Sequence, residues 1–401
     1  MRTAYKVRAY PTPEQAAVLS RTFGCVRVVW NHTLAWRHAR YRGERVTTNF
    51  TQASAHLTAM KATDELAWLN EVSSVPLQQA IRHQQVAFSN FFAGRARYPR
   101  YKSRTGRQSA EYTRSAFRYR DGRLFLAKME APLAFVWSWP DIDPATIDPT
   151  TVTVSRDPDG RWYASFAVDV DDPEQAPATG RMVGVDLGIT AFAVTSDGEK
   201  IANPRHLAKR ERNLARYQRR MARKQRGSSN RAKAKAKVAR AHRKVRASRA
   251  DFLHRASARL VRDHDVIEDL AVANMIRNRS LAKAISDCGW GAFRRLLEYK
   301  ASKHGRHLIV IDRWHPSSKT CSACGHLLAT LNLSTRHWTC PDCGTRHDRD
   351  VNAAKNILAA GLAVSACGGD VRHSGSSRVR SPAKQEPRPA RAGIPVLQGG
   401  E

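Results

Sequence analysis

Near its middle the sequence runs Val183-Gly184-Val185-Asp186-Leu187-Gly188. Apolar residues surround a single carboxylate, which predicts a buried strand ending in an acid. Residues 190–195 form a second candidate strand, and Ser196-Asp197-Gly198 is a turn sequence typical of a hairpin into a third. A charge on an otherwise apolar strand needs a partner or a metal ion. We therefore expect a new domain to begin at Met182, with a sheet that presents Asp186.

Further elements follow along the chain. Val266-Ile267-Glu268 predicts a fourth strand that also ends in an acid, and residues 307–312 predict a fifth. Residues 290–304 have the pattern of an amphipathic helix. A last helix is expected from Asp350 to Ala360, closed by Gly361. This order of strands and carboxylates favours a ribonuclease-H-like domain.

Asp186, Glu268 and Asp350 are the candidate catalytic residues. Each has an ordinary alternative explanation, since Asp350 could simply cap its helix. Asp269 should point to the opposite strand face from Glu268, and Asp348 precedes the helix, so both are weaker candidates. Three converging carboxylates suit phosphodiester hydrolysis with two Mg²⁺ ions, one activating the attacking water and the other stabilising the leaving oxygen.

Four of the seven cysteines form two pairs, Cys321-Ser322-Ala323-Cys324 and Cys340-Pro341-Asp342-Cys343, with fifteen residues between them. Each pair can bend into a knuckle that presents two thiolates, and the spacer is long enough for a hairpin. The alternative is two unrelated thiol pairs or a redox site. Four protein ligands leave no open position, so we predict a structural Zn²⁺ ion rather than a catalytic one.

The charge balance points to a polyanionic partner. The chain has 401 residues, with 68 Lys and Arg against 35 Asp and Glu, a formal net charge of +33. Nucleic acid is the first candidate. A membrane surface is the second, but no run of ~18 apolar residues exists. The N-terminus lacks the apolar core of a signal peptide, so we expect a reducing, cytoplasmic location without membrane contact.

The hydrophobic pattern of the N-terminal half changes twice along the sequence. Residues 5–10 alternate as a strand, and helical spacing continues from Glu14 to about Phe92. Residues 98–104 form a basic loop with interleaved aromatics, and short alternating segments at 109–170 predict a small sheet or barrel. Five aromatic side chains of these segments could stack on bases or pack in the sheet: Tyr98, Tyr101, Tyr112, Phe117 and Tyr119.

Residues 205–250 contain 19 Lys or Arg and one acid, Glu211. Alanine and leucine interleave with the cations, which predicts helices with basic faces, broken near residues 227–230. A basic run is usually a solvated face, but here the excess extends over the whole chain. Residues 368–401 are rich in Ser, Arg, Pro and Gly, and we expect them to be disordered.

Together these segments resemble the TnpB proteins of bacterial insertion sequences, which are relatives of the type V CRISPR effector nucleases. The resemblance covers about residues 4–361. It is carried by short motifs in a fixed order: Tyr10-Pro11-Thr12, Trp30-Asn31, Asp251-Phe252-Leu253-His254, the segment from Pro316 to Ser322 that leads into the first cysteine pair, and Asp348-Arg349-Asp350 with Asn352 and Asn356.

The resemblance implies a multidomain α/β architecture with a RuvC-like nuclease domain interrupted by a zinc ribbon. The expected parts are a wedge β-barrel at 1–12 and 96–175, a helical recognition insertion at 13–95, the nuclease domain at 180–314 with its basic helices at 205–250, the ribbon at 315–346, the last nuclease helix at 347–362 and a tail at 363–401.

The same resemblance implies an RNA-guided DNA endonuclease whose three carboxylates are Asp186, Glu268 and Asp350. A guide RNA derived from the end of the insertion sequence (the element) would specify a double-stranded DNA target that lies next to a short DNA motif. Either a monomer or a homodimer on one RNA fits. The expected nucleic-acid contacts are Arg100, Lys102, Arg104, Arg212, Arg216, Arg219, Arg220, Arg223, Lys224 and Arg249.

Two other functions fit parts of the pattern. A guided regulator that binds without cutting would be expected to have lost at least one of the three carboxylates. A DNA transposase would use similar metal-bound acids but would act on the element's ends without RNA. The nucleic acid that co-purifies with the protein distinguishes these hypotheses.

Overall fold

The computed structural model describes residues 1–171, 175–270, 282–311, 315–332 and 334–366. The chain forms two compact units. The first consists of Met1–Asp172 and Asn213–Arg243, and the second of Pro173–Arg212 and Lys244–Glu401. Two of the three boundaries between them fall inside helices, α4 (Ala208–Ala222) and α5 (Ser229–Asp263). Among the described residues, no helix has the length and hydrophobicity to span a membrane.

The first unit is built on an antiparallel sheet of five strands in the order β2-β6-β7-β1-β5. Its ladders leave β2 and β5 as edges, so the described residues do not form the closed barrel that the resemblance implied. The alternation of buried and exposed residues on β6 and β7 confirms the predicted strands at 151–155 and 162–168. The strands are β1 (Arg2–Tyr10), β2 (Gln108–Thr113), β5 (Ala134–Val136), β6 (Pro149–Arg156) and β7 (Trp162–Asp169).

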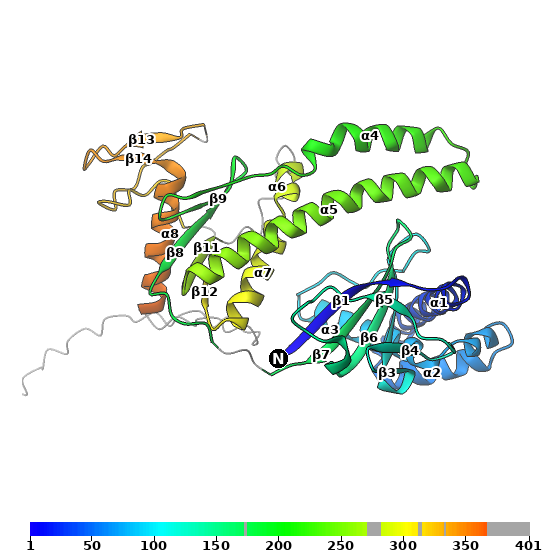
Figure 1. Ribbon diagram of the computed structural model, residues 1–401. Helices are drawn as coiled ribbons and strands as arrows, with labels where there is room; N and C mark the ends of the chain where they lie inside the picture. The colour runs from blue at the N-terminus through cyan, green and yellow to red at the C-terminus, as the bar shows by residue number, and fades with distance from the viewer. Residues whose placement is uncertain (172–174, 271–281, 312–314, 333, 367–401) are drawn as a thin grey trace, which may run out of the picture. The chain divides into compact units, whose positions relative to one another are not determined.

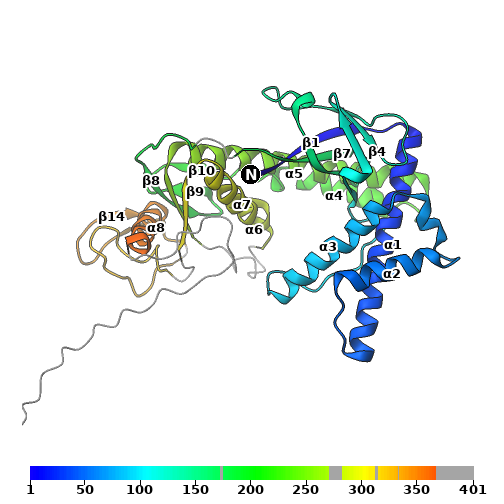
Figure 2. The same ribbon diagram turned by 90° about the horizontal axis from the view of Figure 1, so that it is seen from below.

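Three helices occupy the predicted helical segment, α1 (Pro13–Glu44), α2 (Phe50–Ala62) and α3 (Ser74–Phe92), as Figure 2 shows. α1 begins where Thr12 and Gln15 form a capping box, with proline at the first helical position. Buried side chains of the helices and of the sheet form one continuous core. Short elements complete the unit: η1 (Ala67–Glu71), η2 (Arg114–Ala116), η3 (Pro144–Thr146), and the hairpin β3 (Phe117–Arg120) with β4 (Arg123–Leu126).

The second unit contains a mixed sheet in the order β10-β9-β8-β11-β12. β8, β9 and β10 pair antiparallel, whereas β11 runs parallel to both β8 and β12. All five predicted strands are present: β8 (Met182–Leu187), β9 (Ala191–Thr195), β10 (Lys200–Ala202), β11 (Val266–Leu270) and β12 (His307–Ile311).

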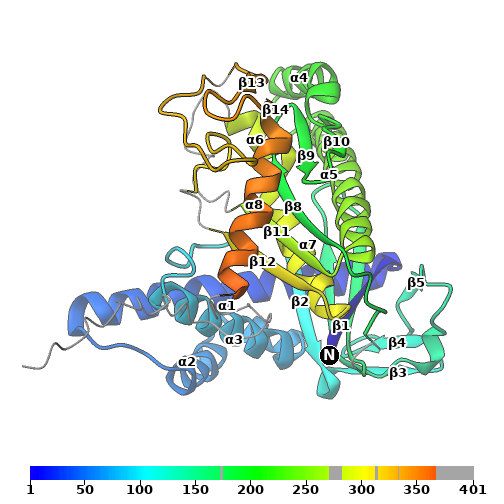
Figure 3. The ribbon, with the colours of Figure 1, turned by 90° about the vertical axis from the view of Figure 1, so that its left-hand side faces the viewer.

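Helices cover this sheet. α6 (Ala282–Cys288) and α7 (Trp290–Lys303) contribute to its core, and α8 (Arg349–Ala366) packs over β8, β11 and β12 (Figure 3).

The prediction that Gly361 closes the last helix was wrong. Glycine in a helix interior costs about 1 kcal/mol relative to alanine, and the alanine-rich sequence around Gly361 tolerates it. The tail expected from 363 is therefore helical to Ala366, and residues 367–401 lie outside the described residues.

The basic segment forms two helices, as predicted. α4 ends at Ala222 and the long, unbroken α5 begins at Ser229 (Figure 1). Gly227 lies between them at φ 86°, a left-handed conformation that favours glycine. The ribbon segment adds a two-stranded sheet of β13 (His337–Thr339) and β14 (Arg346–Asp348), and β14 continues directly into α8.

Candidate active site and metal centre

Helix α8 can lie close to strand β8 because Gly184 has no side chain. A Cβ atom at Gly184 would lie 2.1 Å from the carbonyl oxygen of Ala354 and 2.7 Å from the backbone nitrogen of Leu358. Val183, Val185 and Leu187 are buried in the core of the sheet. Residues alternate across a strand, so Gly184 and Asp186 share the other face, against which α8 packs.

This packing brings Asp186 and Asp350 together from distant parts of the sequence. Burial and, second to it, the nearby negative charge of Asp350 together raise the pKa of Asp186 to about 7, against the opposing effect of Arg349. A buried carboxylate beside a second acidic side chain forms an electrostatic environment suited to a bound cation. Hard oxygen ligands such as these match Mg²⁺.

Glu268 lies on the strand next to Asp186. In the parallel register of β11 with β8 it pairs with Gly184, and on its other side it pairs with Ile309 of β12. The backbone of the third predicted carboxylate is thus beside β8, two residues from Asp186 along that strand.

Asp348 fixes the start of α8. Its Oδ1 accepts hydrogen bonds from the backbone N–H groups of Asp350 and Val351, at 3.0 and 3.1 Å, which is the role of an N-cap. Its other oxygen lies 2.6 Å from the Lys200 ammonium. Although burial opposes the change, the Lys200 ion pair and the backbone donors lower the pKa of Asp348. These contacts give Asp348 a structural role at the start of α8.

Arg336 is a residue of this site that the sequence analysis did not find. Its guanidinium lies 3.9 Å from Asp350 and donates a hydrogen bond at 3.3 Å to the hydroxyl of Thr190, just beyond β8. Arg336 precedes β13 in the ribbon segment and belongs to no motif. Only the fold, which returns the ribbon to the start of α8, could reveal its position.

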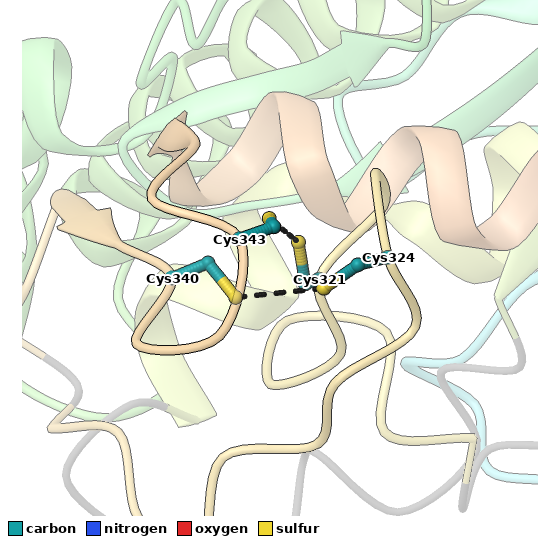
Figure 4. A group of neighbouring side chains, drawn as sticks. All are labelled: Cys321, Cys324, Cys340 and Cys343. Carbon is teal, nitrogen blue, oxygen red and sulfur yellow. Dashed lines mark hydrogen bonds between the residues drawn. The ribbon is translucent and has the colours of Figure 1, made fainter.

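The four predicted zinc ligands do converge. The sulfur atoms of Cys321, Cys324, Cys340 and Cys343 all lie within 4.8 Å of one another and point inward (Figure 4). Hydrogen bonds from the Thr345 hydroxyl and backbone lower the pKa of Cys343. Although the backbone of His326 opposes the change, burial and the neighbouring sulfur atoms raise the pKa of Cys324, as expected of thiols crowded together. The donor set and its compactness fit a tetrahedral zinc site.

His347 contacts one sulfur atom of this cluster. Its Nε2 lies 3.0 Å from the sulfur of Cys321, and its ring is 4.7 Å from that of Trp338. Both rings are buried. In the tautomer with its proton on Nε2, His347 would donate to this sulfur, as outer contacts of metal sites typically do.

The basic loop at 98–104 is held against α1 by two neighbouring side chains. Trp30 Nε1 donates to the carbonyl of Arg100 at 2.9 Å, and the Asn31 amide bonds both the N–H and the C=O of Lys102, at 2.8 and 3.0 Å. The Lys102 ammonium lies 4.0 Å from the centre of the Trp30 ring, and burial lowers its pKa. Lys102 is therefore engaged within the protein, whereas Arg100 and Arg104 are exposed.

The five aromatic side chains that were candidates for stacking on bases differ in how far they are buried. Tyr112 is buried, Tyr119 packs against Phe166, and Phe117 packs against the core of the first unit. Tyr98 contacts Phe88 and Phe91 but stays 41% exposed, and Tyr101 is 59% exposed. Tyr101 is thus the most accessible of the five candidates for stacking.

The predicted nucleic-acid contact residues on the basic helices also differ in exposure. Arg249 donates to Asp287 at 2.8 Å in a partly buried ion pair, which favours a structural role. The remaining candidates on α4 and in the turn after it are exposed: Arg212, Arg216, Arg219, Arg220, Arg223 and Lys224.

Three family descriptions match successive parts of the chain. Residues 165–279 match "Probable transposase" of the OrfB_IS605 type, residues 290–357 match the Cas12f1-like TNB domain, and residues 1–45 match "Helix-turn-helix domain". In this structure residues 1–45 form one strand and one long helix, β1 and α1, rather than two helices joined by a turn.

Two similar proteins span the whole chain. One, from Streptomyces pristinaespiralis, is 56% identical over 402 residues, covering 99% of each chain. The other, from Escherichia coli (strain K12), is 32% identical and covers 96% of this chain and 97% of its own. Both carry the name "Putative RNA-guided DNA endonuclease", the second with the addition InsQ. A shorter match of 93 residues, 33% identical, joins 23% of this chain to 17% of the TnpB-like protein L79 of Acanthamoeba polyphaga mimivirus.

The chain belongs to the TnpB family. Its fold is similar to that in a solved structure described as a Cas12f1–sgRNA–target DNA complex, with a TM-score of 0.55 at 12% identity over 89% of this chain and 98% of the other. Such a likeness concerns the fold alone.

Proposed function

We propose that this TnpB-family chain is an RNA-guided DNA endonuclease with a RuvC-like active site. The observation that carries the proposal is the meeting of Asp186 and Asp350 where α8 packs on β8, with their charges opposing each other. The names of the full-length relatives support the same activity. The mixed sheet, with three antiparallel strands followed by two parallel ones, supports the RuvC-like assignment.

Asp186, Glu268 and Asp350 would hold Mg²⁺, which when bound supplies an activated water and stabilises the leaving oxygen. The protein's own contribution is to fix these acids. Gly184 admits α8, the strand register sets the backbone of Glu268, and Asp348 caps the helix. Arg336 adds a positive charge next to Asp350, where it could neutralise part of the charge of a DNA phosphate.

The four-cysteine cluster has a structural role in this proposal. A Zn²⁺ ion with four thiolate ligands has no open position for a substrate. The ion would hold the ribbon that carries Arg336 and leads through β14 into α8. Zinc would therefore support the geometry of cleavage without taking part in it.

The partners would be a guide RNA and a double-stranded DNA target. The exposed cations of α4 and of the loop at 98–104 are the proposed backbone contacts, and Tyr101 is the proposed stacking side chain. The guide would read the DNA sequence by base pairing, while the protein reads a short adjacent motif.

Nucleic acid purified with the protein, from cells that carry its native flanking DNA, tests this function. We expect a discrete RNA that ends in sequence beyond the element, and Mg²⁺-dependent cleavage of matching DNA. Asp186→Ala, Glu268→Ala and Asp350→Ala should each abolish cleavage and keep the RNA, with Asp269→Ala as the matched control that still cuts. Wild-type cleavage by the Asp186→Ala protein would disprove the site.

A DNA transposase is the second candidate, because the match over residues 165–279 bears that description. It predicts that DNA of the element's ends, and not RNA, co-purifies with the protein. Strand transfer of labelled element ends by protein treated with ribonuclease would favour this alternative. Loss of all activity after ribonuclease treatment would favour the guided nuclease.

A further inference from the structure

Two asparagines on one side of α8 bind the loop that leads into the first cysteine knuckle. The Asn352 amide nitrogen donates to the carbonyl oxygens of Thr320 and Ser317, at 2.7 and 3.4 Å. The Asn356 amide nitrogen donates to the same two oxygens, at 2.6 and 2.7 Å. The Asn352 carbonyl oxygen accepts the backbone N–H of Ser322 at 2.9 Å.

These contacts are buried and specific. Asn352 is 1% exposed and Asn356 is 7% exposed. Asparagine is a poor residue for a helix interior, and a buried amide is unfavourable unless its hydrogen bonds are made. Here the two amides supply hydrogen bonds to the loop carbonyls of Ser317 and Thr320 and to the N–H group of Ser322. An apolar side chain could fill the space but could not hold the loop.

These hydrogen bonds link the four-cysteine cluster to the candidate carboxylate site through only a few residues. Ser322 directly follows the ligand Cys321, and Asn352 lies two residues after Asp350 on the same helix. The second knuckle reaches the same helix by another route, since β14 follows it and runs into α8. The cysteine cluster thus holds the start of α8 both through the chain and through Asn352.

We infer that Asn352 and Asn356 are positioning residues that couple the four-cysteine site to Asp350. With zinc bound, the knuckle is rigid and the two amides hold the first turns of α8 in the place where Asp350 faces Asp186. Without zinc, or without the amides, α8 keeps its packing on β8 but its first turn is less well fixed. This inference rests on the proposed carboxylate site.

Coupling between two sites is reciprocal, so it can be measured by binding alone. The probe is Mn²⁺, titrated against the full-length protein without DNA and followed by electron paramagnetic resonance. Zinc content is measured in each sample, and the titration is repeated after the zinc has been removed with a chelator. In the wild type we expect zinc removal to weaken Mn²⁺ binding roughly tenfold, the effect typical of losing an outer contact of a metal site.

The variants separate positioning from simple stability. Zinc-loaded Asn352→Ala and Asn356→Ala should bind Mn²⁺ nearly as weakly as the zinc-free wild type, and removing their zinc should change little more. Asn352→Asp keeps the acceptor for Ser322 and should show a smaller loss. Thr345→Ala is the matched control, because it removes the hydroxyl bonded to Cys343 in the second knuckle. It should release zinc faster but bind Mn²⁺ normally while zinc is bound.

The outcomes also distinguish this inference from the proposed function. If Asp350→Ala leaves Mn²⁺ binding unchanged, the carboxylate site itself is wrong. If Asp350→Ala abolishes binding but the folded, zinc-loaded asparagine variants bind Mn²⁺ like the wild type, only the coupling is overturned. If Asn352→Ala does not fold, Asn352→Asp and Asn356→Ala decide the question by the same titration.

Discussion

Gly184 and Ala354 are in contact through their backbones, and no other residue at position 184 could allow this. A Cβ atom there would come within 2.1 Å of the Ala354 carbonyl oxygen, far inside any normal contact. The obstacle is helix backbone, which cannot turn away as a flexible side chain can. The position of Asp350 next to Asp186 therefore depends on a glycine two residues before the first carboxylate.

Gly184→Ala should displace α8 and separate the two carboxylates. Overpacking typically costs 1–3 kcal/mol, and we expect a loss of about 3 kcal/mol here because backbone must move. Cleavage should be lost even where the protein stays folded. Thermal unfolding and a DNA cleavage assay test both effects.

Gly291→Ala is the control for this substitution. Gly291 lies in α7 of the same unit, and its new methyl group would meet only the end of the Arg295 side chain, at 3.8 Å. Alanine is the better helix former, so stability should stay equal or rise by up to about 1 kcal/mol. Equal behaviour of the two alanine variants would contradict the close-packing argument.

Asp186→Asn should make the metal-free protein more stable at neutral and higher pH while abolishing cleavage. The folded-state pKa of Asp186 is raised to about 7 from an ordinary value of 3.8. The folded protein therefore holds this proton more tightly than the unfolded chain does, and stability falls as the pH rises from about 4 to about 7. Because Asp186 is only partly buried, we expect a gain of about 1–2 kcal/mol at pH 8.

Denaturation of both proteins in a chelator, from pH 4.5 to 8.5, measures this effect. The two curves should coincide at the acidic end and diverge through pH 7. Added Mg²⁺ should stabilise the wild type and leave Asp186→Asn unchanged, since a ligand stabilises only the state that binds it. Parallel pH profiles would show that Asp186 does not bear the raised pKa.

The strands of the second unit and the convergence of the four cysteines could be predicted because their signals are local. An acid on an apolar strand, such as Asp186, stands out in the sequence, and paired cysteines at metal spacing need no structure to be recognised. The helices before Phe92 and the break near Gly227 are equally local in origin, and the structure contains them.

Features set by contacts between distant segments could not be predicted. Nothing near Arg336 shows that its guanidinium returns to Asp350, 14 residues later in the chain. Lys102 has the same charge as Arg104, but its place on the Trp30 ring depends on how α1 and the loop meet. Whether a five-stranded sheet closes into a barrel likewise depends on the pairing of its edges, which composition does not specify.

The basic loop offers a comparison between two neighbouring cations. Arg104→Ala should weaken binding of nucleic acid and reduce the dependence of log affinity on log salt by about one unit, as the loss of one phosphate contact does. Lys102→Ala should leave the salt dependence unchanged, because its ammonium already lies on Trp30. Affinity for the purified RNA at several salt concentrations measures both. An equal fall in slope for the two variants would show that Lys102 leaves the ring to bind phosphate.

Arg336 should contribute directly to cleavage. Its guanidinium is half-exposed and lies 3.9 Å from Asp350, so it can approach a phosphate at the carboxylates without first breaking a buried ion pair. Arg336→Ala should lower the cleavage rate by about 100-fold, the lower end of the range seen when one preorganised donor is removed, and should leave the affinity for RNA unchanged. Arg336→Lys should restore part of the rate, because it keeps the charge but loses the planar fork. Single-turnover cleavage with saturating protein separates the rate from binding. If Arg336→Ala cuts at the wild-type rate but releases zinc faster, Arg336 serves only to fasten the ribbon to Thr190 and Asp350.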